Sequence, residues 1–130
     1  AWGVEISTET NPWEAGLEFA ISLGKDAFVG KEALLNLREN LSRKLVAITF
    51  DDIRHVPLGN EPIRIADEII GRVKSGGQGY TIEKAIAYAY LPIAHAGAGT
   101  KVEVEFFGKW SEGLICAQPL FDPTNSRIRC

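Results

Sequence analysis

Cysteine is scarce in this sequence, which contains only Cys116 and Cys130 and no Cys-x-x-Cys motif. Cys116 lies in an apolar run and is expected to be a buried thiol, and the low cysteine content favours a reducing compartment. The two histidines, His55 and His95, stand far apart, so the short spacing typical of metal ligands is absent. We therefore expect no metal site, although ligation by residues that the fold brings together stays open.

A basic excess and a long hydrophobic run are also lacking. The 130 residues have a net charge of −3, and no nucleic-acid partner is expected, because such a surface needs a clustered basic face. A small anionic ligand is still compatible, since a few local cations suffice. The longest nearly apolar run, residues 85–94, is too short to span a bilayer, and no signal peptide is visible at Ala1. The chain fits one globular domain or a piece of a larger protein, and we expect the natural protein to extend upstream.

Alternating apolar and polar residues dominate the chain from Arg43 onward. Residues 70–92 predict a strand, a glycine-rich connection over Ser75–Tyr80 and a second strand over Ala85–Leu91. Both faces of that second strand are apolar, which favours a central position. Further strands are predicted at residues 45–50, 63–65, 101–107 and 110–117. Six strands joined by short turns predict a small antiparallel β-barrel.

The leading segment has a different character, and we place a domain boundary between residues 1–42 and 43–130. Thr10-Asn11-Pro12 predicts a cap and a proline that open a single helical turn, with Glu14 placed where the helix dipole favours an anion. Leu17–Leu23 is predicted as a short strand. The one helix is predicted from about Gly30 to Asn40, because apolar residues recur at helical spacing and are expected in the core: Val29, Ala33, Leu34, Leu37 and Leu41. The predicted fold is therefore mainly β with one helix.

Three local patterns suggest catalysis or phosphate binding, and each has a simpler explanation. The glycine cluster at residues 76–79 lacks the spacing of a Walker loop or a dinucleotide fingerprint and precedes a strand, so a tight connection is favoured. Asp51 and Asp52 are adjacent and point to opposite sides of a strand end, which favours a solvated loop. His55 and His95 lie near turn residues and are expected at the surface, outside any Ser-His-Asp arrangement. No catalytic residue is predicted in this chain.

Two features favour ligand binding more strongly. Trp2 and Trp13 flank a short segment and offer flat faces on which a heterocycle could stack, although core packing is the favoured interpretation. Arg127 and Arg129 alternate in an extended tail, and arginine is suited to gripping carboxylates bidentately. A solvated terminus explains the arginines equally well.

Short motifs in a fixed order span nearly the whole chain. The leading motifs are Trp2-Gly3-x-Glu5-Ile6, Glu9-Thr10-Asn11-Pro12-x-Glu14-Ala15-Gly16-Leu17 and Phe28-x-Gly30-Lys31-x-Ala33-Leu34. They resemble the end of the folate-binding region of the glycine cleavage T-protein (aminomethyltransferase) family. The later motifs, Gly71-x-Val73-x-Ser75-Gly76, Lys84-x-Ile86-Ala87 and Pro119-x-Phe121-Asp122-Pro123, resemble the C-terminal barrel of that family. The resemblance implies that residues 1–42 end a folate-binding domain and that residues 43–130 form the barrel.

Within the family, Trp2-Gly3, Asn11-Pro12 and the run from Gly79 to Pro92 are most similar to flavin-dependent dimethylglycine oxidases and dehydrogenases and sarcosine dehydrogenases. In such enzymes FAD oxidises an N-methyl amine to an iminium, and tetrahydrofolate takes the carbon to give 5,10-methylenetetrahydrofolate. The resemblance implies a partial tetrahydrofolate site in which Trp2 lies near the pterin. We further infer that Arg127 or Arg129 meets the glutamate tail, from the carboxylate argument alone.

The family's catalytic aspartate and its flavin-binding region have no counterpart in this sequence. We therefore expect a C-terminal fragment, inactive by itself, whose partner is the upstream half of its own polypeptide and whose parent binds FAD. The parent is expected in the cytoplasm, or in the mitochondrial matrix of a eukaryote. Two alternatives stay open: a non-catalytic regulatory or interaction relative, and a stand-alone aminomethyltransferase that works with a lipoyl protein.

Overall fold

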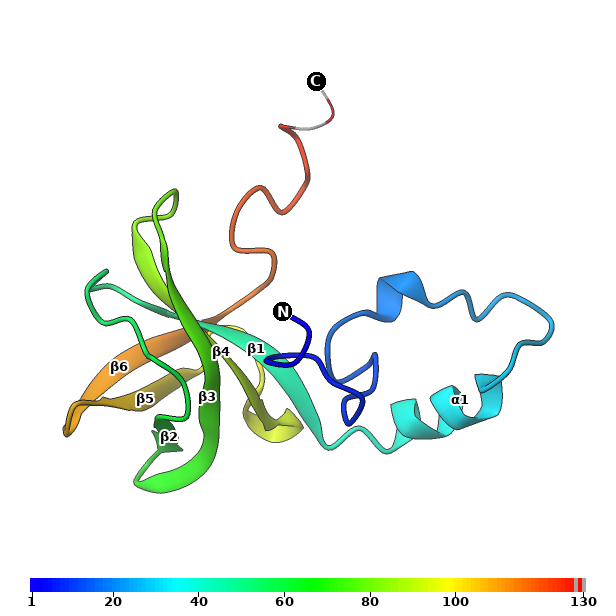
Figure 1. Cartoon of the computed structure of the whole chain (residues 1–130), viewed down its shortest axis with the longest axis horizontal. Helices are drawn as coiled ribbons and strands as arrows, with labels where there is room; N and C mark the ends of the chain where they lie inside the picture. Colours follow the sequence, from blue (N-terminus) through cyan, green and yellow to red (C-terminus); the bar gives the residue numbers. More distant parts are fainter. Residues whose placement is uncertain (128, 130) are drawn as a thin grey trace.

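The computed structural model describes residues 1–127 and 129, so Ile128 and Cys130 lie outside the described residues. Figure 1 shows a barrel, a leading segment that carries the helix to one side of it, and a C-terminal tail that runs away from both. The described chain is mainly β with a single α-helix, as the sequence predicts. None of its helices combines the length and the hydropathy that a membrane span needs.

A capped turn organises the leading segment. The Asn11 side-chain oxygen accepts hydrogen bonds from the backbone N–H groups of Trp13 and Glu14, both at 3.0 Å. The Glu14 carboxylate accepts the Asn11 N–H at 3.1 Å, which completes a reciprocal capping box. The predicted cap at Asn11 is therefore confirmed, and Glu14 has a second role that the dipole argument did not include.

The rest of the leading segment contains one correct and one wrong prediction. The helix α1 (Lys31–Glu39) forms where predicted, between Gly30 and Asn40. The strand predicted over Leu17–Leu23 is wrong, because Glu18–Ala20 forms the short 3-10 helix η1. Its backbone bonds are local, from Ala20 N–H to the Leu17 carbonyl at 3.0 Å.

Six antiparallel strands close into a barrel, as predicted, in the spatial order β1-β4-β3-β2-β5-β6. Their bounds are β1 (Arg43–Phe50), β2 (Pro62–Ile65), β3 (Glu68–Gly79), β4 (Lys84–Pro92), β5 (Lys101–Phe106) and β6 (Lys109–Cys116), with the 3-10 turn η2 (Ile93–His95) after β4. Pairing of β6 with β1, which includes Ala47 opposite Cys116, closes the ring. Closure removes the exposed strand edges that a sheet of this size would otherwise carry.

The barrel interior is filled from every strand, and β4 contributes three alanines and a leucine to it. Ala85, Ala87, Ala89 and Leu91 are all fully buried, and β4 pairs with β1 on one side and β3 on the other, as predicted for a strand that is not at an edge. Larger side chains oppose these alanines and fill the space that small residues leave. The buried cluster also contains Val46, Ile48, Phe50, Ile63, Val73, Val102, Val104 and Ile115.

The glycine-rich segment is strand, not the connection that we predicted. Residues 75–79 belong to β3 and pair with β4, and the turn falls at residues 80–83 instead. Gly76 is required by close approach, because a Cβ there would lie 2.0 Å from the Pro57 carbonyl oxygen. The segment is extended and leads into a second strand, so it offers no phosphate loop.

Two packing features depart from simple periodicity. In β3, Ile70 is an extra residue where the register with β2 shifts, so Ile70 packs against the core and Ile69 is 51% exposed. In α1, no residue is buried, and the apolar stripe expected in the core is open, with Leu37 43% exposed. Periodicity identified the stripe correctly, but the described residues cover it only in part, at Leu34 and Leu41.

Candidate functional site

A tight loop at the start of the chain presents Trp2 to solvent. The Ala1 carbonyl accepts the N–H groups of Val4, Glu5 and Ile6 at 3.2, 3.1 and 3.3 Å, and Gly3 adopts a positive φ of 88°. Trp2, 73% exposed, lies on the rim of an open hollow of about 300 Å³ between this loop and the capped turn. The hollow has room for part of a bicyclic ring system, with the indole as its flat wall.

Trp13, the other predicted aromatic candidate, has a structural role. It is 6% exposed, and its indole N–H donates to the Leu34 carbonyl at 2.7 Å. The Arg38 guanidinium lies 5.4 Å from its ring centroid. Core packing, the favoured interpretation for both tryptophans, therefore holds for Trp13 and is wrong for Trp2.

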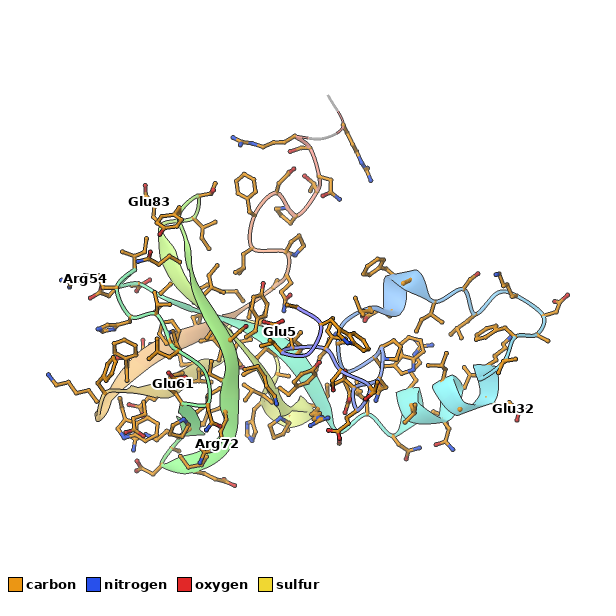
Figure 2. The ribbon with its side chains drawn as sticks, viewed as in Figure 1. Glu5, Glu32, Arg54, Glu61, Arg72 and Glu83 are labelled. Carbon is orange, nitrogen blue, oxygen red and sulfur yellow. The ribbon has the colours of Figure 1, made fainter. Side chains whose placement is uncertain are left out.

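The barrel holds the Trp2 loop through Glu5. The Tyr90 hydroxyl donates to the Glu5 carbonyl at 2.7 Å, and the Ser75 hydroxyl donates to the Glu5 carboxylate. The other carboxylate oxygen of Glu5 is buried and lies against the backbone nitrogen of Ala1. Figure 2 labels Glu5 where the leading segment meets the barrel.

A second set of contacts fixes the capped turn to the same part of the barrel. The Arg43 side chain donates to the Glu14 carboxylate at 2.8 Å, and the Leu45 N–H donates to the Glu14 carbonyl at 2.7 Å. The Arg43 guanidinium also lies 5.1 Å from the Tyr90 ring centroid. Hydrogen bonding to Glu14 raises the pKa of Arg43, and burial raises the pKa of Tyr90, so Tyr90 remains a hydrogen-bond donor.

Sequence reasoning missed Glu5, Ser75 and Tyr90 as neighbours. Ser75 and Tyr90 are 70 and 85 residues from Glu5, and nothing in a period-2 pattern indicates such a pairing. The only local signal for a role of Glu5 was that it belongs to a motif that resembles the T-protein family, Trp2-Gly3-x-Glu5-Ile6.

The two tail arginines lie beyond β6. The Arg127 N–H donates to the Asp122 carboxylate at 3.0 Å, and the Arg127 guanidinium stacks 5.1 Å from the Phe121 ring centroid. This backbone hydrogen bond, together with those from Ser126, lowers the pKa of Asp122. Arg129 is exposed. Within the described residues no contact joins either arginine to Trp2, so their common folate role stays a prediction.

The adjacent carboxylates Asp51 and Asp52 are paired with cations. Asp51 accepts from Lys84 at 2.7 Å, and Asp52 receives two side-chain hydrogen bonds from Arg54 at 2.9 and 2.8 Å. These hydrogen bonds lower the pKa of each carboxyl group, which is the opposite of what a general acid needs. Both residues lie in the loop after β1, in agreement with the sequence interpretation.

The fold does bring a serine, a histidine and an aspartate together, which we did not expect. The Ser111 hydroxyl lies 3.4 Å from His55 Nδ1, and the Asp52 carboxylate lies 3.7 Å from His55 Nε2. Asp52 is already bonded to Arg54 and is too far away to orient the imidazole as a triad aspartate does. The His55 ring instead lies 5.3 Å from that of Phe106, and we assign it no catalytic role.

The remaining candidates form no reactive site in the described part of the chain. Cys116 is half-buried, and its sulfur lies 3.2 Å from the Thr49 hydroxyl. No group of three metal-ligating side chains is found among residues 1–127 and 129.

The barrel and the segment that precedes it define a chain of the T-protein type. The chain belongs to the family described as glycine cleavage T-protein C-terminal barrel domain, which matches residues 43–122. The family resemblance predicted from the motifs is thereby confirmed.

The relatives include two kinds of enzyme. The chain is 41% identical to mitochondrial dimethylglycine dehydrogenase of Homo sapiens over 99% of its own length and 15% of that protein. It is 40% identical to the aminomethyltransferase of Symbiobacterium thermophilum over 97% of its length and 34% of that protein. The crystal structure of glycine cleavage system aminomethyltransferase T from Bartonella henselae superposes with a TM-score of 0.82 at 26% identity, covering 95% of this chain and 35% of that one.

Proposed function

We propose that this chain is the C-terminal part of a flavin-dependent N-methyl amine oxidoreductase whose T-protein-like half transfers a one-carbon unit to tetrahydrofolate. The observation that supports this most directly is the 41% identity with dimethylglycine dehydrogenase across 99% of the chain. The chain supplies one wall of the folate site and no catalytic group. The activity on dimethylglycine or sarcosine belongs to the longer polypeptide.

The residues at the hollow suit part of a folate molecule. Trp2 would hold the pterin by stacking, because its indole is exposed on the rim of the hollow. Arg127 and Arg129 would hold the glutamate carboxylates, as guanidinium groups do in bidentate pairs. Bound tetrahydrofolate would accept the one-carbon unit, and FAD, held by the upstream half, would take the electrons of the amine.

Two other functions fit specific observations. A stand-alone aminomethyltransferase fits the 40% identity to the Symbiobacterium enzyme over 97% of the chain. A non-catalytic relative fits a chain in which no catalytic residue is assigned. We propose a cytoplasmic location, or the mitochondrial matrix in a eukaryote, where the name of the human relative places that enzyme.

The test is tetrahydrofolate binding by the full-length polypeptide, measured by isothermal calorimetry. Stacking on an aromatic side chain contributes about 1–3 kcal/mol, so Trp2→Ala should weaken binding by about five- to 150-fold. Phe19→Ala is the matched control, because Phe19 is an 84% exposed aromatic residue of the same segment that does not line the hollow. Unchanged affinity in Trp2→Ala would remove the stacking assignment.

The arginine assignment has its own measurement. The double variant Arg127→Ala with Arg129→Ala should weaken polyglutamylated folate more than the monoglutamate, because only the longer tail has further carboxylates to lose. Equal losses would refute the arginine assignment.

The 130-residue chain alone should neither oxidise dimethylglycine nor hold tetrahydrofolate tightly, and micromolar binding by this chain would contradict the shared site. Flavin reduction by dimethylglycine in the full-length protein separates the oxidoreductase from both alternatives.

A further inference from the structure

We propose that Tyr90, together with Ser75, is a positioning residue that sets the orientation of the Trp2 indole, so the barrel determines the shape of the folate wall. The link between this positioning and folate binding rests on the proposed function. The contacts themselves are independent of any ligand, which allows the two ideas to be tested separately.

The first step of the argument is that Glu5 and Trp2 move as one unit. The loop of residues 1–6 is closed by three hydrogen bonds to the Ala1 carbonyl, and the Gly3 N–H donates to the Ile6 carbonyl at 2.6 Å. Trp2 also forms a bridge with Ile6. A shift of the Glu5 backbone is therefore passed on to the Trp2 indole, three residues away.

The second step is that the barrel holds this loop at Glu5 through two neighbouring strands. Tyr90 on β4 is 8% exposed, and its hydroxyl reaches the Glu5 carbonyl at 2.7 Å. Ser75 on β3 binds the Glu5 side chain, which is only 13% exposed. Because β3 and β4 pair through this region, with Ser75 opposite Tyr88, the two anchors are rigid relative to each other.

The third step is that Tyr90 also supports the opposite wall of the hollow. Its ring lies under the Arg43 guanidinium at 5.1 Å, and Arg43 pairs with Glu14 of the capped turn at 2.8 Å. One side chain thus sets the distance between the loop that carries Trp2 and the turn that faces it.

The orientation of Trp2 can be followed in this chain by fluorine NMR after incorporation of 5-fluorotryptophan. Three resonances are expected from the three tryptophans, and Trp2→Phe assigns one of them. Tyr90→Phe should shift or broaden the Trp2 resonance and leave that of Trp110, in β6, unchanged. The matched control is Tyr88→Phe. Tyr88 lies on the same face of β4, and its hydroxyl makes no hydrogen bond among the described residues.

A second variant keeps the idea falsifiable if Tyr90→Phe lowers the yield of folded protein. Ser75→Ala should also shift the Trp2 resonance, and Ser75→Thr, which keeps a hydroxyl, should restore it. An unchanged Trp2 resonance in a folded Tyr90→Phe or Ser75→Ala variant overturns the positioning role.

The full-length polypeptide then links positioning to folate. Tyr90→Phe should raise the tetrahydrofolate dissociation constant about three- to ten-fold, while Tyr88→Phe leaves it unchanged. If Trp2→Ala weakens binding and Tyr90→Phe does not, the barrel has no part in the folate wall. If neither variant changes affinity while the NMR shift is present, the proposed folate role of Trp2 fails and the structural coupling stands.

Discussion

Replacing Gly76 by alanine tests how closely the loop after β1 packs against β3. The added Cβ would lie 2.0 Å from the Pro57 carbonyl oxygen and 2.9 Å from its carbonyl carbon. Real Cβ atoms stay beyond about 3 Å from such atoms, so the loop or the strand must move by roughly 1 Å.

The loop has little freedom to make that movement. The Glu61 carboxylate accepts the N–H groups of Leu58 and Gly59 at 2.6 and 2.8 Å, and the Asn60 N–H donates to the Val73 carbonyl at 2.7 Å. Overpacking against backbone costs about 3 kcal/mol when the surroundings cannot relax. For a chain of this length the melting temperature should fall by roughly 10 °C.

Gly77→Ala is the control for this prediction, because no heavy atom lies within 4 Å of a Cβ at Gly77 in the same strand. Its free energy of unfolding should stay within about 0.5 kcal/mol of the wild type. Urea unfolding followed by circular dichroism measures the free energy of unfolding of both variants, and the dependence of that free energy on urea concentration should be unchanged. Equal stabilities for Gly76→Ala and Gly77→Ala would show that the loop yields and that its hydrogen bonds do not fix it.

Three further predictions concern the leading segment and the loop after β1. Asn11→Ala removes the acceptor for two backbone N–H groups and should cost about 1 kcal/mol in urea unfolding. Trp13→Phe removes a buried indole together with its hydrogen bond to the Leu34 carbonyl and should cost about 2 kcal/mol in the same assay. The hydrogen bonds from the Arg54 side chain lower the pKa of Asp52 in the folded protein. The ionised Asp52 therefore stabilises the fold fully above its unfolded pKa of about 4, and this stabilisation is lost as pH falls through the folded pKa. Asp52→Asn should therefore lower the urea midpoint at pH 7, and the difference from wild type should shrink toward pH 2.

Much of the barrel could be predicted because its strands obey period-2 alternation. Val102 and Val104 on β5 are almost fully buried, and Phe107-Gly108 form the turn to β6 with positive φ values of 48° and 78°. The wrong predictions fall where a contact distant in sequence overrides the local signal. Gly76 looks like a turn residue until Pro57 is placed beside it, and only the fold provides that neighbour.

The helix shows a different limit. A stripe at helical spacing indicates which side chains share a face of the helix, but it does not show which other part of the protein packs against that face. Leu34 and Leu41 are the half-buried members of the stripe, and the Leu34 carbonyl accepts the Trp13 indole N–H. The burial of Trp13, rather than of the leucines, is what attaches α1 to the capped turn.

At the candidate site, the sequence pattern shows which side chains share a face but not which distant residues they contact. This distinction bears on the role of the barrel. Alternation correctly groups Tyr88 and Tyr90 on one face of β4, yet only the Tyr90 hydroxyl meets the Glu5 carbonyl at 2.7 Å. Bulk at these positions is a packing requirement, whereas the hydroxyl at Tyr90 and the one at Ser75 serve the leading loop. If the loop needed only to be covered, phenylalanine and alanine would be sufficient at these two positions. Two donors aimed at one glutamate indicate that the barrel controls where the loop lies, and through it where the exposed indole points.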